Sequence, residues 1–96
     1  MSSRTPAECV DLATDSTAPR EEREDAIDEL RTANECDELA DIAANDTLET
    51  DYRRYALKAM ATPQCDTLLS DLAERDELEP SLQREAEALL YDPTED

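Results

Sequence analysis

The sequence LADIAANDTLETDYRRYALKAM at residues 39–60 is repeated in pattern by LSDLAERDELEPSLQREAEALL at residues 69–90 and by CVDLATDSTAPREEREDAIDEL at residues 9–30. At an offset of 30 the segments align without a gap. The aligned apolar positions are Cys9 with Leu39 and Leu69, Leu12 with Ile42 and Leu72, Ala13 with Ala43 and Ala73, Ala26 with Ala56 and Ala86, and Leu30 with Met60 and Leu90. Such a period indicates a repeat protein whose units bury their apolar faces against their neighbours.

Each unit is predicted to hold two amphipathic helices. Leu39, Ile42 and Ala43 recur at i, i+3 and i+4, which is one face of a helix, and a second stripe of the same period starts at Tyr52. The sequence predicts helices over residues 6–15, 19–32, 35–45, 50–61, 63–75 and 80–91. We expect one domain over residues 1–96, with repeats at about 6–34, 35–62 and 63–92.

The helix boundaries carry capping residues. Residues 5–8, Thr-Pro-Ala-Glu, have the pattern of a capping box with proline at the first helical position. Asn34 and the pair Thr62-Pro63 are expected to start the first helices of the second and third repeats.

The composition excludes several kinds of active site. The chain has 27 acidic residues against 9 basic ones, a net charge of -18, and neither histidine nor glycine. It therefore has no imidazole base, no histidine-ligated zinc and no glycine-rich phosphate loop. We expect no enzyme activity, no cofactor and no specific metal site.

The charge resembles that of cytoplasmic proteins from extreme halophiles. Basic residues are eight arginines and one lysine, Lys58, and aspartate is almost as frequent as glutamate. Multimolar salt shortens the Debye length to about 3 Å and screens the self-repulsion of such a chain. We therefore expect folding to depend on salt, with salt cations as non-specific counterions.

Neither a membrane span nor a disulfide is expected. No segment approaches the roughly 18 apolar residues of a membrane helix, and no apolar signal core follows the start of the chain, so we predict a cytoplasmic protein. Cys9, Cys36 and Cys65 are odd in number and widely spaced. We predict that all three are buried free thiols.

Residues 52–60 (YRRYALKAM) and 82–90 (LQREAEALL) resemble the second helix of short HEAT-like repeats, the kind found in phycobilisome lyases. Arg53 stands at the arginine position of that motif, with Arg23 and Gln83 at its equivalents. Asp46 and Asp76 stand at its aspartate position, whereas the glycine that often ends the second helix is absent.

This resemblance implies a right-handed α-solenoid of three helix-turn-helix repeats, used for protein contacts. No residue matches a bilin-handling role, so the resemblance implies no lyase activity.

The basic cluster of Arg53, Arg54 and Lys58 is expected to form ion pairs between repeats. We expect Arg53 and Arg54 to pair with acids such as Asp41 and Asp46. Nucleic acid binding is not expected, because the net charge repels a polyanion.

A partner surface is expected at the C-terminal end. The first repeat has a mostly charged second helix, which suits an outer cap. The less protected face carries Leu82, Leu89, Leu90 and Tyr91, and we expect it to receive a protein partner or a second copy of the chain. Alternatively, Glu85 and Glu87 keep this face hydrated in a monomer.

Together these features predict a non-catalytic protein-interaction or scaffolding module. The alternative is an acidic helical decoy that mimics DNA and binds a basic nucleic-acid-binding protein. A decoy would lose affinity steeply with salt, whereas an apolar contact would survive it.

Overall fold

The computed structural model describes residues 4–75 and 78–91, and within these residues it contains helices and no strands. The helices are α1 (Pro6–Ala13), α2 (Arg20–Thr32), α3 (Cys36–Ala43), α4 (Thr50–Ala59), α5 (Asp66–Arg75) and α6 (Pro80–Tyr91). The six predicted helices and the all-α class are confirmed. The observed ends differ from the predicted ones by up to three residues, mainly because the first helices start later or end earlier.

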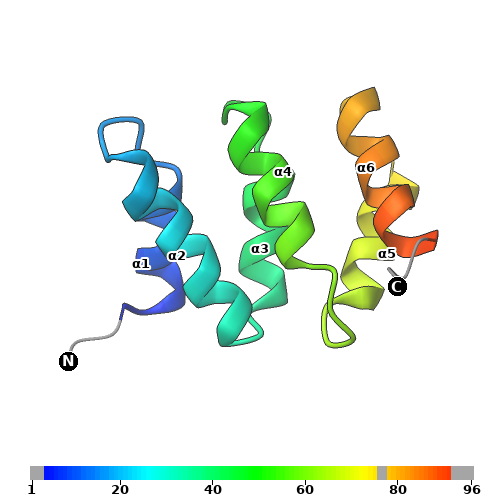
Figure 1. Cartoon of the computed structure of the whole chain (residues 1–96), viewed down its shortest axis with the longest axis horizontal. Coiled ribbons are helices and arrows are strands. Elements are labelled where there is room, and N and C mark those ends of the chain that lie inside the picture. The colour runs from blue at the N-terminus through cyan, green and yellow to red at the C-terminus, as the bar shows by residue number, and fades with distance from the viewer. Residues whose placement is uncertain (1–3, 76–77, 92–96) are drawn as a thin grey trace.

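The helices pack as three neighbouring pairs in two layers (Figure 1). α1 packs on α2, α3 on α4 and α5 on α6. In one layer α2 contacts α4 and α4 contacts α6, and in the other α1 contacts α3 and α3 contacts α5. The loops that join α1 to α2 and α3 to α4 lie at the upper edge in Figure 1, and the loops between pairs lie at the lower edge.

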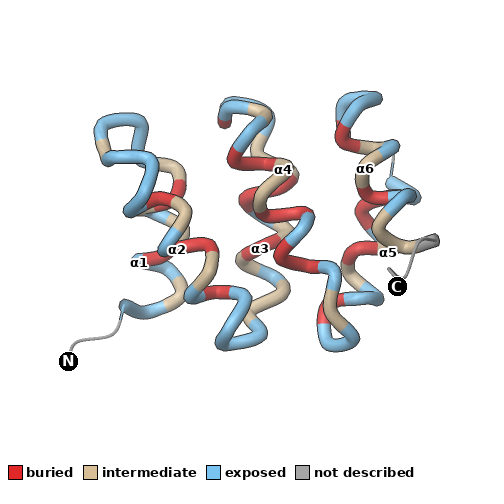
Figure 2. Tube along the Cα trace, in the orientation of Figure 1, coloured by how far each residue is buried: buried red, intermediate tan, exposed pale blue. Residues whose placement is uncertain are grey.

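The buried residues recur with the 30-residue period along the helices (Figure 2). Ala26, Ala56 and Ala86 are fully buried at equivalent positions on the second helices. Leu12 and Leu90 are only half-buried, whereas their equivalents in the middle pair, Ile42 and Met60, are fully buried. The end pairs have a neighbour on one side only, but burial within them varies, since Leu30 and Leu72 at the same repeat positions are 1% and 2% exposed.

A side chain from each second helix binds the end of the first helix in its own pair. Arg23 Nε donates to the Ala13 carbonyl at 3.0 Å, and Arg53 Nε donates to the Ala43 carbonyl at 2.9 Å. In the third pair Gln83 Nε2 donates to the Ala73 carbonyl. The last carbonyls of a helix have no partner within it, so these bonds satisfy buried acceptors.

The two buried arginines also reach the next helix pair. Arg23 and Arg53 are only 3% and 4% exposed. Arg23 lies 3.3 Å from Glu49, just before α4, and Arg53 lies 4.0 Å from Glu79, just before α6. The ring of Tyr52 on α4 stacks under Arg23, with its centroid 3.8 Å from the guanidinium carbon. The guanidinium of Arg23 therefore joins α1 and α2 of the first pair to α4 of the second pair.

Two of the expected helix starts are wrong. Asn34 has φ 59° and ends α2, with the Glu35 N–H donating to the Leu30 carbonyl at 2.9 Å and the Asn34 N–H to the Arg31 carbonyl at 3.0 Å. This is a Schellman motif, in which asparagine takes the left-handed position because the chain has no glycine.

The start of the third unit differs in a similar way. The Cys65 N–H donates to Thr62 Oγ1 at 3.3 Å and to the Thr62 carbonyl at 3.1 Å, so residues 62–65 form a turn before α5 begins at Asp66. The capping box at Thr5 and Glu8 is confirmed.

Cys36 and Cys65 form a disulfide, so the expectation of three free thiols is wrong for these two residues. Cys36 is the first residue of α3, and Cys65 immediately precedes α5. The 30-residue period brings the starts of α3 and α5 side by side at one edge. The spacing of the cysteines along the sequence does not by itself show this. Cys9 remains a buried free thiol, as predicted.

We predict that this crosslink stabilises the fold. Closing a loop with a sequence separation of 29 residues lowers the entropy of the unfolded chain, which corresponds to about 3 to 4 kcal/mol. Chemical denaturation of the oxidised and the dithiothreitol-reduced chain measures the difference. The Cys36→Ala variant should match the reduced chain and should not respond to dithiothreitol. Equal stability of the oxidised and reduced wild type would contradict this prediction.

Candidate interaction groove

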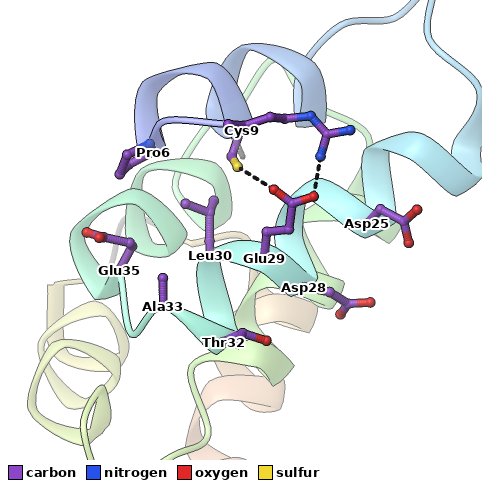
Figure 3. Close-up of a pocket in the computed structure, with 10 residues that line it drawn as sticks. Pro6, Cys9, Asp25, Asp28, Glu29, Leu30, Thr32, Ala33 and Glu35 are labelled. Carbon is purple, nitrogen blue, oxygen red and sulfur yellow. Dashed lines mark hydrogen bonds and ion pairs between the residues drawn. The ribbon is translucent and has the colours of Figure 1, made fainter. Parts of the chain in front are cut away.

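An open groove of about 650 Å³ lies between the start of α1, the second half of α2 and the turn before α3 (Figure 3). Two local features position its walls. The capping box fixes the entry to α1, with the Glu8 N–H donating to Thr5 Oγ1 at 3.1 Å. The acidic face of α2 presents Asp25, Asp28 and Glu29 at i, i+3 and i+4. The lining residues are Arg4, Pro6, Cys9, Asp25, Asp28, Glu29, Leu30, Thr32, Ala33 and Glu35.

The lining of the groove is mostly apolar. Cys9 and Leu30 are 2% and 1% exposed, and Pro6 and the exposed Ala33 lie beside them (Figure 3). Such a surface can take the aliphatic part of a ligand.

Glu29 is the central polar group of the groove (Figure 3). The Cys9 thiol donates to Glu29 Oε1 at 3.5 Å, and the Arg4 guanidinium donates to Glu29 Oε2. The side chains of Arg4 and Glu29 are 36% and 45% exposed, so solvent weakens their ion pair.

The free thiol is held in its protonated form. Burial raises the pKa of Cys9, and the hydrogen bond and negative charge of Glu29 raise that pKa further. A nucleophilic or redox-sensing cysteine needs a lowered pKa instead. The thiol therefore supports packing and hydrogen bonding in the groove, and not nucleophilic chemistry.

The carboxylates outnumber the cations along this groove. Asp25, Asp28, Glu29 and Glu35 line it, against the single guanidinium of Arg4. Asp28 also accepts a hydrogen bond from the Tyr55 hydroxyl of α4 at 3.0 Å, and Tyr55 has a raised pKa because of its burial and this bond. The excess of carboxylates gives the groove a negative potential that suits a cationic ligand.

A smaller hollow of about 200 Å³ lies on the other side of Asp28. It is lined by Asp28, Arg31, Tyr55, Lys58 and Ala59. Lys58 is exposed here, whereas the neighbouring Arg53 of the predicted basic cluster is buried and engaged with Ala43 and Glu79.

Arg53 and Arg54 both form ion pairs with the next helix pair, as expected, but with other acids than Asp41 and Asp46. Arg53 pairs with Glu79, and Arg54 lies 3.8 Å from Asp51 and 3.9 Å from Glu85. Asp41 and Asp46 are exposed, and neither accepts from these arginines. The guanidinium of Arg53 is held by the Ala43 carbonyl and is directed to the start of α6, which explains why those acids are not used.

The expected partner residues on α6 do not form one exposed surface. Leu82 is fully buried, so its assignment to an exposed partner face is wrong. Leu89 and Leu90 are half-buried and pack against the core. Tyr91 ends α6, and its side chain lies outside the described residues. The apolar stripe of α6 is thus directed largely to α4 and α5.

No protein-family model matches the chain, and no curated protein and no solved structure matches it. In the part of the chain that the structure describes, no three His, Cys, Asp or Glu residues are placed to hold a metal ion. None of the helices within residues 4–75 and 78–91 is long and apolar enough to cross a membrane.

Sequence reasoning missed the groove. The acids of α2 are evident in the sequence, but a mostly charged second helix predicts an outer cap and not one wall of a groove. Another wall comes from Arg4, which lies far from Asp25 in sequence and approaches it only through the packing of α1 on α2, whereas Glu35 belongs to the turn that ends α2.

We predict that Cys9 alkylation by iodoacetamide has its pH midpoint above that of a cysteine in a short unstructured peptide in the same salt. The Glu29→Gln variant should lower this midpoint, because the hydrogen bond to a carboxylate and its charge are removed. Cys9 is the free thiol of the oxidised chain, so the signal is unambiguous. A midpoint at or below that of the peptide would contradict the assigned environment.

Proposed function

We propose that the chain is a non-catalytic protein-interaction module, built as a short right-handed HEAT-like solenoid of three helix pairs. The proposal of a solenoid is supported by the bonds that recur every 30 residues from Arg23, Arg53 and Gln83 to the first helices. It is also supported by the order of the helix contacts, because each pair packs on the next in sequence.

The groove between α1, α2 and α3 is the observation that carries the proposal of binding. It combines an apolar floor with carboxylates at its rim, and this is the usual make-up of a recognition site. The pKa of its thiol is raised, which does not favour nucleophilic catalysis by Cys9. The proposed partner site therefore lies at the N-terminal end of the row of helix pairs.

The acidic composition supports a role in a salt-rich cytoplasm, where screening allows so negative a chain to fold. The disulfide between Cys36 and Cys65 argues against a reducing compartment, because disulfides are rare there.

The acidic decoy is the second candidate function. Its support is the outer face of α1 and α3, where Glu8, Asp11, Asp37 and Asp41 are exposed and neither helix has a lysine or an arginine. A basic partner would be attracted to this face through charge alone, and salt would weaken that contact.

The test is protein capture in multimolar KCl, followed by titration of the purified partner. Ala33→Arg places a large side chain in the groove, and Ala61→Arg makes the same change at an exposed alanine after α4. We expect Ala33→Arg to weaken binding about tenfold or more, which is about 1.4 kcal/mol, and Ala61→Arg to change it less than twofold.

Three results would contradict this function. They are equal effects of the two variants, the absence of a retained protein, and binding that DNA displaces and that is lost with salt. The last result would favour the decoy.

A further inference from the structure

We propose that the groove receives an arginine side chain from an exposed segment of the partner protein, and that Arg4 fills the same place in the unbound chain. The inference rests on the proposed function and names the chemistry of the partner.

Arg4 shows how a guanidinium fits. Arg4 precedes α1 and lines the groove, and its guanidinium pairs with Glu29 Oε2. Arg4 lies outside the helix, and its side chain is 36% exposed. Exposed pairs of this kind are weak, so an external guanidinium can replace Arg4 without unfolding a helix.

The floor suits the stem of an arginine. The exposed Ala33 and the half-buried Pro6 are the accessible apolar residues of the groove, and Leu30, only 1% exposed, lies behind this surface. Long basic side chains lay their methylene groups along such surfaces while their charged ends stay near solvent and carboxylates. The groove therefore offers contacts to both parts of one arginine side chain.

The charge of the groove also favours a cation. Asp25, Asp28 and Glu35 line it in addition to Glu29, and Arg4 supplies one positive charge against these four carboxylates. Asp25 and Glu29 are one helical turn apart on α2, so a guanidinium with its five donors can approach both. A lysine ammonium lacks this planar fork, which is why we expect arginine to be preferred.

The probe is a short fluorescein-labelled peptide with one arginine between leucines. Its binding is followed by fluorescence anisotropy at the lowest KCl concentration that gives the full helical circular dichroism signal. Analogues with lysine or with citrulline, which is neutral and close to arginine in shape, replace the arginine. We expect the lysine peptide to bind more weakly and the citrulline peptide about tenfold more weakly.

The decisive variant is Arg4→Gln, which removes the competing guanidinium. We expect it to raise the affinity of the arginine peptide by about threefold, in line with the strength of an exposed ion pair. Arg84→Gln is the matched control, because Arg84 is exposed on α6 and the change in net charge is identical. This control should alter the affinity by less than 1.5-fold.

Removing the carboxylate of Glu29, which accepts from the guanidinium, should lower the affinity for the arginine peptide. Glu29→Gln is expected to lower the affinity about fivefold, while Glu21→Gln, an exposed position in the first turn of α2, should have little effect. Circular dichroism of each variant confirms that it is folded. Because Arg4→Gln predicts a gain of binding, damage to the fold cannot imitate the expected result.

The inference is overturned if Arg4→Gln and Arg84→Gln change the affinity equally, since net charge would then be the cause. It is also overturned if the citrulline peptide binds as well as the arginine peptide, or if no peptide binds. If a protein partner is nevertheless retained and responds to Ala33→Arg, the proposed function stands and only the arginine assignment fails. If no protein is retained, the proposed function itself fails.

Discussion

The buried guanidinium on the second helix of a pair is the constraint on which the rest of the structure depends. Burying a charge is costly unless it is hydrogen-bonded and paired. Arg23 meets both conditions through the Ala13 carbonyl and Glu49, and Arg53 meets them through the Ala43 carbonyl and, at 4.0 Å, Glu79. Each arginine thus needs a carboxylate from the following pair, which ties the pairs into a row. In the third pair the neutral Gln83 makes the carbonyl bond without needing such a partner.

The two edges of the row are held by different interactions. The arginines act at the edge where α1 ends and α2 starts, while the disulfide joins the starts of α3 and α5 at the opposite edge. The first pair has no such crosslink, and its Cys9 thiol instead binds Glu29. The groove opens beside this pair, and its carboxylates on α2 include Glu29, which binds Arg4 and Cys9, and Asp28, which accepts from Tyr55.

The sequence alone predicted the helices well because their stripes repeat with the helical period, as in Leu39, Ile42 and Ala43. It also placed Arg23, Arg53 and Gln83 at equivalent positions. It could not show that these side chains are buried, because arginine is normally an exposed residue. The Cys36–Cys65 bond and the groove escaped prediction for a related reason, since both depend on which helix ends meet. The prediction that Leu82 lies on an exposed partner face is wrong, because an apolar stripe does not show which neighbouring helix covers it.

The most direct test of the central claim is hydrogen exchange at the arginine Nε–H groups, measured by ¹⁵N nuclear magnetic resonance in high KCl. Arg23 and Arg53 should give slowly exchanging signals, because their Nε–H groups are buried and bonded to the Ala13 and Ala43 carbonyls. The exposed Arg31 and Arg84 should exchange fast. Fast exchange at all arginines, with the helices intact, would show that the guanidinium groups do not hold the helix pairs together.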